Sequence, residues 1–229
     1  MDWGWIGRNL DLIGNRVLEH VGLAVPPIVI GFLISIPLGY WASRSRVVRS
    51  ILLTSGNILY TIPSIALLVL VPVALGRAIL DPLNVVVALT IYAIALMLRV
   101  STDAFASVPP EVRSSAVALG YSGVQRFFAV ELPLAGPVML AGVRVVSVST
   151  VSLVTIGAVI GIDSLGSFFT NAFQVAFPTE AYVALVLVLV IAAVFDVILS
   201  IIGRVLMPWR PHAVAPKPTW LRRTLNGGA

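Results

Sequence analysis

Long apolar segments constrain the fold of this chain more than any other feature. Five of them occur, at residues 21–42, 51–76, 85–98, 134–161 and 181–206. A helix needs roughly 20 apolar residues to cross a bilayer, whereas the strands of a transmembrane barrel are about half as long and alternate with polar residues. With 59% hydrophobic and 11% charged residues, the chain also has too few charges to cover a soluble globule. The sequence therefore predicts an all-α, polytopic membrane protein with about five transmembrane helices.

The remaining segments are predicted to lie at the membrane surface or to connect the spans. Residues 1–19 carry Trp3 and Trp5 among scattered charges, which favours an interfacial helix with its tryptophans at headgroup depth. Residues 162–179 are marked by glycines and moderately apolar, which predicts a hairpin or re-entrant piece. Residues 208–229 are rich in proline and basic side chains and predict a cytoplasmic surface tail. We expect one transmembrane domain over residues 1–207.

The basic residues predict the orientation in the membrane, because cytoplasmic loops carry an excess of lysine and arginine. If the first span runs from outside to inside, the residues that fall inside are Arg44, Arg46, Arg49, Arg99, Arg113, Arg126, Arg204, Arg210, Lys217, Arg222 and Arg223. Arg8, Arg16 and Arg77 then fall outside. The amino terminus is therefore expected outside and the carboxyl-terminal tail in the cytoplasm. The basic residues are not clustered with aromatic ones, so the net charge of +5 does not indicate nucleic-acid binding.

One polar stretch, residues 109–137, interrupts the apolar chain on what is expected to be the cytoplasmic side. Pro109 and Pro110 suit the start of a helix, and Glu111 in its first turn suits the positive end of the helix dipole. Gly120 stands where a left-handed cap would end that helix. The stretch thus predicts a short cytoplasmic helix and turn within residues 109–125, followed by a more apolar element. The alternative is a plain amphipathic connector.

Two charged residues lie inside predicted spans. Arg144 and Asp196 are each about ten residues from the cytoplasmic end of their span, which at ~1.5 Å rise per residue is roughly 15 Å deep. Equal depth and opposite charge predict an ion pair that fixes the packing of the two helices, since unpaired charges at such depth are costly. The alternatives are that Arg144 snorkels or meets helix carbonyls, and that Asp196 faces a wet cavity.

A polar, proline-broken centre distinguishes the second span and predicts a substrate path. Pro63 frees a backbone carbonyl there, beside the ring of Tyr60 and the hydroxyls of Thr61 and Ser64. In the fourth span, Ser147 and Thr150 either face the same path or bond back to the helix backbone, which is the commoner fate of such hydroxyls. The alternative for Pro63 is a kink that serves packing only.

Several function classes find little support. The chain has no cysteine, no metal-ligand spacing and no paired carboxylates, and its two histidines, His20 and His212, lie outside the expected core, which argues against an intramembrane enzyme. The phosphate-binding pattern Gly-x-x-x-x-Gly-Lys-Ser/Thr does not occur, so the chain itself is not expected to hydrolyse ATP. A channel or secondary transporter for small polar solutes remains an alternative, because spans and a broken helix do not specify the energy source.

The polar stretch resembles the cytoplasmic loop of binding-protein-dependent ABC importer permeases. That loop has the pattern Glu-Ala-Ala, three residues, Gly and a spacer ending in Leu-Pro, and Gly120, Leu132 and Pro133 match its glycine and its ending. The Glu-Ala-Ala positions fall on residues that lack the glutamate of the motif, namely Ser114, Ser115 and Ala116. Glu111 lies one turn earlier.

Three further stretches resemble the osmoprotectant permeases within that family. They are NILYTIPSIALL from Asn57, PLAGPVMLAGVR from Pro133 and GAVIG from Gly157, and the resemblance covers about residues 21–205. It implies a type I importer fold in the plasma membrane of a prokaryote. It further implies import of glycine betaine, choline, carnitine or proline.

The resemblance also implies partners and sites. The partners would be ATP-hydrolysing subunits, a second permease that is a copy or a relative, and an extracytoplasmic binding protein, with ATP used by the ATPase and no cofactor held by this chain. The implied ATPase-docking residues are Glu111, Arg113, Ser114, Ser115, Ala116 and Gly120. A quaternary ammonium group in the path would be held by aromatic faces and carbonyl dipoles.

Overall fold

A computed structural model describes residues 1–209, so most of the tail expected at 208–229, with His212, lies outside the described residues. The described part is helical throughout. Its elements are α1 (Trp3–Arg8), α2 (Leu10–Arg44), α3 (Arg46–Thr61), α4 (Ser64–Leu75), α5 (Pro82–Ala106), α6 (Pro110–Ala118), α7 (Gly123–Arg126), a π-helical turn η1 (Phe127–Glu131), α8 (Leu132–Val154), a 3-10 turn η2 (Thr155–Ile160), α9 (Gly166–Gln174) and α10 (Pro178–Leu206).

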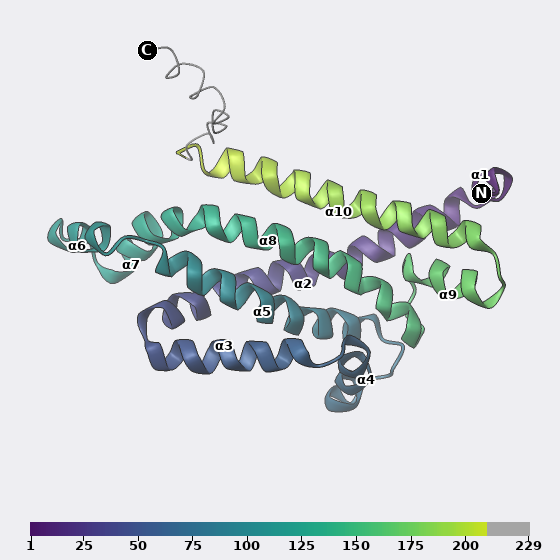
Figure 1. Ribbon diagram of the computed structural model, residues 1–229, viewed down its shortest axis with the longest axis horizontal. Coiled ribbons are helices and arrows are strands. Elements are labelled where there is room, and N and C mark those ends of the chain that lie inside the picture. The colour runs from purple at the N-terminus through teal and green to yellow at the C-terminus, as the bar shows by residue number, and fades with distance from the viewer. Residues whose placement is uncertain (210–229) are drawn as a thin grey trace, which may run out of the picture.

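The long helices run side by side, and the short elements gather at the two ends (Figure 1). At one end lie α6 and α7; at the other lie α1 and α9. Four spans are long and apolar enough to cross a membrane, and a fifth arises if α3 and α4 form one span. The expected all-α fold with about five spans is thus confirmed.

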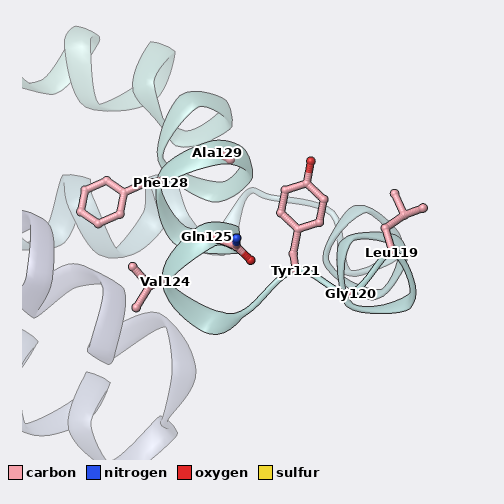
Figure 2. Close-up of a pocket in the computed structure, with 7 residues that line it drawn as sticks. All are labelled: Leu119, Gly120, Tyr121, Val124, Gln125, Phe128 and Ala129. Carbon is pink, nitrogen blue, oxygen red and sulfur yellow. The ribbon is translucent and has the colours of Figure 1, made fainter.

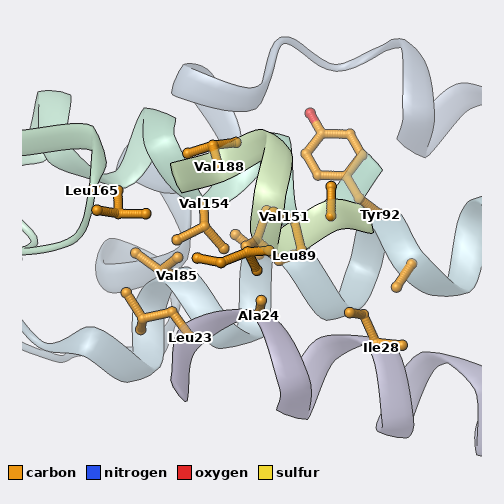
Figure 3. Packing of buried hydrophobic residues seen from close by; sticks show 14 of the residues in the cluster. Leu23, Ala24, Ile28, Val85, Leu89, Tyr92, Val151, Val154, Leu165 and Val188 are labelled. Carbon is orange, nitrogen blue, oxygen red and sulfur yellow. The ribbon is translucent and has the colours of Figure 1, made fainter. Parts of the chain in front are cut away.

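Helix α5 forms the centre of the bundle and packs against α2, α3, α4 and α8. Its buried residues Val85, Leu89 and Tyr92 lie in one apolar cluster with residues from α2, α8 and α10 (Figure 3). The partners that Figure 3 labels from the other elements are Leu23, Ala24, Ile28, Val151, Val154, Leu165 and Val188. This cluster links elements that are far apart in the sequence.

The structure refines several predicted boundaries. The third span is not 85–98 but extends through Ala106, because Ser101 and Thr102 are buried and Thr102 donates a hydrogen bond to the Leu98 carbonyl. The expected interfacial segment 1–19 is divided at Asn9, after which α2 continues without a break into the first span. Residues 162–179, expected as a hairpin or re-entrant piece, contain the short helix α9.

The second span is not one helix, because α3 and α4 are bent by 103° at Ile62 and Pro63. The Ile62 carbonyl accepts a hydrogen bond from the buried Tyr92 hydroxyl of α5, which ties the break to the centre of the bundle. The Ile62 N–H donates to the Leu59 carbonyl at 3.3 Å. Both backbone polar groups of Ile62 are therefore hydrogen-bonded at the bend.

Helices α2 and α5 approach each other closely where α2 carries glycine. A Cβ added at Gly31 would lie 2.6 Å from the Ala93 Cβ, and one added at Gly39 would lie 2.7 Å from the Ser101 carbonyl carbon. Gly31 and Gly39 are two turns apart and both are buried. Small residues at such positions let helix backbones come together in membranes.

We predict that Gly39→Ala destabilises the protein by about 1–3 kcal/mol, because the new methyl group would overlap the α5 backbone. The thermal melting temperature of the purified protein in detergent measures this loss. Gly22→Ala is the matched control on the same helix, since no atom lies within 4 Å of an added Cβ there. Equal melting temperatures for the two variants would contradict the close contact.

Candidate functional site

The polar stretch forms two short helices joined by a tight turn. Helix α6 begins at Pro110, and Gly120 after it has φ of +83°, the left-handed conformation that glycine adopts without strain. Helix α7 begins with a capping box in which the Ser122 hydroxyl accepts from the Gln125 N–H and the Gln125 side chain accepts from the Ser122 N–H. The structure thus contains the short helix and the glycine turn that the sequence predicted.

The predicted docking residues of α6 divide into two groups. Glu111, Ser114 and Ser115 are exposed, whereas Ala116 is buried. Arg113 is turned inward, where its guanidinium donates to the Phe105 carbonyl at the end of α5. Arg113 therefore joins α6 to the bundle in this structure.

Beside this turn lies a hollow of about 620 Å³ lined by Leu119, Gly120, Tyr121, Val124, Gln125, Phe128 and Ala129. Figure 2 shows Leu119 and Tyr121 on the turn and Val124 and Phe128 on the neighbouring helix. Leu119 is 77% exposed, and Val124 and Phe128 are exposed as well. Exposed apolar side chains gathered around a hollow are typical of a surface that binds another protein.

A buried carboxylate lies directly behind this segment. Glu131 has no exposed surface, and three arginines surround it. Arg44 at the end of α2 donates from Nη2 to Oε1 at 2.5 Å and to Oε2 at 2.6 Å, and Arg126 of α7 donates from Nε to Oε1 at 2.9 Å. Arg113 Nε lies 3.6 Å from Oε2, beyond hydrogen-bond length. We call Glu131 and these three residues the arginine cluster.

Sequence reasoning missed the arginine cluster, and Glu131 was not among the predicted site residues. The available signal was a single acidic residue beside an apolar segment, at the same membrane side as several arginines. The backbone around Glu131 also has local causes. Pro133 has no N–H to donate to the Ala129 carbonyl. The turn before it is π-helical, and the Leu132 N–H donates to the Phe127 carbonyl. π-Helical turns are frequent at functional sites.

At the second-span break, the structure exposes much of the predicted substrate path. Tyr60 is half exposed at the end of α3, and Thr61 and Pro63 are exposed, while Ser64 is partly buried. The Tyr60 ring packs edge-on against the Tyr92 ring at 5.8 Å. The break thus presents an aromatic ring, with a second ring buried behind it.

The two hydroxyls of the fourth span that were predicted as candidates for the same path do not lie at the break. Ser147 and Thr150 are buried inside the bundle, and Ser147 donates to the Val143 carbonyl at 2.7 Å. Neither lines an open surface in this structure. Ser147 therefore follows the predicted alternative, in which the hydroxyl bonds back to the helix backbone.

Arg144 and Asp196 are joined by two hydrogen bonds. Arg144 Nε and Nη2 donate to Asp196 Oδ1 and Oδ2, each at 2.6 Å, so that α8 and α10 share a bidentate ion pair. Both side chains are more than one third exposed at the surface of the bundle. Within residues 1–209, no group of three His, Asp or Glu side chains is arranged to hold a metal ion.

The helical bundle, the short helix pair α6–α7 and the broken span are consistent with a multi-pass membrane protein. Residues 31–210 match the family described as binding-protein-dependent transport system inner membrane component, and the chain belongs to this family. It is therefore the permease of such a system. ATP hydrolysis belongs to another subunit, so family membership decides against the channel or secondary-transporter alternative.

Curated relatives and solved structures agree with this assignment. The chain is 27% identical to the choline transport system permease protein OpuBB of Bacillus subtilis, over 84% of this chain and 88% of that protein. It is 28% identical to the osmoprotectant import permease protein OsmW of Salmonella typhimurium, over 87% and 94%. An inward-facing structure of the MetNI methionine ABC transporter matches with a TM-score of 0.76 at 22% identity, over 87% and 98%. That structure supports the fold.

For the intramembrane pair, we predict that Asp196→Asn lowers the melting temperature because it leaves the Arg144 guanidinium without its carboxylate. The double variant Asp196→Asn with Arg144→Gln should regain most of that loss, since neither partner is then left charged and alone. Melting curves of the two variants in the same detergent make the comparison. A double variant no more stable than the single one would show that the two side chains act independently.

Proposed function

We propose that this permease imports compatible solutes of the quaternary ammonium class, such as glycine betaine, choline or carnitine, or else proline. The observation that carries the proposal is the set of relatives that match most of the chain. Besides OpuBB and OsmW, it includes the glycine betaine/carnitine/choline permease protein OpuCB of Bacillus subtilis, 26% identical over 83% of this chain. The exposed ring of Tyr60 at the break fits such a cation, which has no N–H to donate.

The ATPase subunit is proposed to bind the α6–α7 segment. The exposed apolar residues Leu119, Val124 and Phe128 support this role, together with the hollow beside them. Glu111, Ser114 and Ser115 supply polar groups on the exposed side of α6. An extracytoplasmic binding protein would deliver the solute at the opposite end, where α1 and α9 lie (Figure 1).

Orientation and assembly belong to the same proposal. The structure gathers Arg44, Arg113 and Arg126 at one end of the bundle, which favours a cytoplasmic location for that end and an outside amino terminus. A second permease is proposed to cover the polar face of α3, where Thr54, Asn57 and Thr61 are exposed. Polar side chains at membrane depth face water or another helix rather than lipid.

The second permease is proposed to be a related chain or a second copy. In Bacillus subtilis two different permease proteins, OpuCB and OpuCD, carry the name of one glycine betaine/carnitine/choline system, and both resemble this chain. The absent motif glutamate at Ser114 favours a relative that has the standard motif. The water-lined path would lie between the two chains.

We predict that Leu119→Asp abolishes co-purification of the ATPase, because the charge would lie in the apolar docking surface. Phe173→Asp is the matched control, since Phe173 is 91% exposed in α9 at the opposite end of the bundle. Pull-down of the tagged permease with its ATPase measures the effect. Retention of the ATPase by Leu119→Asp would place the docking surface elsewhere.

For the solute class, we predict ATP-dependent uptake of at least one labelled compatible solute into proteoliposomes that contain the complete transporter and its binding protein. Tyr60→Ala should lower that uptake by about two- to fivefold, because Tyr60 is half exposed and a cation–π contact at an exposed site contributes about 0.5–1 kcal/mol. A panel of glycine betaine, choline, carnitine and proline identifies the solute. Transport of none of them would contradict the substrate class, and full uptake by Tyr60→Ala would remove that residue from the path.

A further inference from the structure

The arginine cluster connects several elements at the end of the bundle where α6 and α7 lie. Glu131 stands at the junction of η1 and α8, Arg44 ends α2, Arg113 belongs to α6 and Arg126 ends α7. Arg113 also donates to the Phe105 carbonyl near the end of α5. Glu131 thus links the end of α2 and the end of α7 at the start of α8, and Arg113 beside it links α6 to the end of α5.

The three arginines bind this carboxylate unequally. Arg44 contacts both oxygens and Arg126 one, whereas Arg113 Nε is buried, 3.6 Å from Oε2 and without a hydrogen-bond partner. A carboxylate has about four acceptor sites, so Oε2 has room for a further donor. A small displacement of α6 would therefore bring Arg113 into hydrogen-bond contact with Glu131 or draw it away.

Arg44, which joins Glu131 to α2, is held in place by aromatic side chains. Arg44 lies over the Tyr40 ring at 4.8 Å and bonds the Tyr40 hydroxyl at 3.0 Å. The Tyr40 ring packs against Phe105 at 5.3 Å and Phe127 at 4.8 Å. Close-packed side chains transmit a displacement instead of absorbing it.

We propose that Glu131 is a positioning residue that transmits movement of α6, through Arg113, to α2, through Arg44. This inference rests on the proposed function, because it assumes that a separate ATPase moves α6. Glu131 touches neither solute nor nucleotide in this scheme. Its charge holds the end of α7 to the end of α2 through Arg126 and Arg44, and Arg113 gains or loses its contact with Glu131 as α6 moves.

The experiment uses the complete transporter in proteoliposomes and measures ATP hydrolysis with and without solute-loaded binding protein. Glu131→Gln keeps the shape of the side chain but leaves three cations around a neutral amide. We expect assembled complexes with basal hydrolysis near that of the unaltered protein and solute-dependent stimulation lower by about tenfold, as for the loss of a typical coupling free energy. Asp103→Asn is the matched control, since it removes a carboxylate from an exposed pair with Arg49 at the same end.

If the transporter with Glu131→Gln does not assemble, the variants Arg44→Gln and Arg44→Lys test the proposal instead. The Gln variant should lose stimulation, and the Lys variant should retain most of it because the positive charge beside Glu131 is kept. Stimulation in assembled Glu131→Gln, or in Arg44→Gln, within about twofold of the unaltered complex would overturn the proposal. Absence of any stimulation in the unaltered complex would instead contradict the proposed function.

Discussion

The end of the permease where α6 and α7 lie depends on the burial of one negative charge. A carboxylate removed from water costs several kcal/mol unless its partners are close and well placed, and Glu131 has no exposed surface. Its partners come from three different elements, so that α2, α6 and α7 meet around one carboxylate. The α6–α7 segment, which is proposed to bind the ATPase, is thereby connected to the membrane bundle.

Close packing between helices connects the α6 end of the bundle to the break between α3 and α4. Glycines in α2 let its backbone meet α5 directly, and α5 in turn packs against α3, α4 and α8. At the far end of α3, the Tyr92 hydroxyl of α5 bonds the Ile62 carbonyl at the break. A movement that begins at α6 thus has a packed route to the broken span, where the solute path is proposed. The Arg144–Asp196 pair fixes α10 to the same body.

The sequence predicted the features that residue patterns and depth in the membrane indicate. Apolar length alone identified the spans, Gly120 identified the turn, and equal depth with opposite charge joined Arg144 to Asp196. The missed features depend on contacts between distant residues. Glu131 and Arg44 are 87 positions apart, and the 103° bend at Pro63 is held by a hydroxyl from another helix. The burial of Ser147 and Thr150 also escaped prediction, because an almost uniformly apolar helix does not reveal which side faces its neighbours.

The central claim is that the ATPase subunit binds this permease at the α6–α7 segment. The chain contains no cysteine, so single cysteines can be placed one at a time and cross-linked within the assembled transporter. A cysteine at Leu119 should form a cross-link to the ATPase that changes in yield between nucleotide-bound and nucleotide-free states, and one at Phe173 should form none. Cross-linking from Phe173 with none from Leu119 would contradict the account.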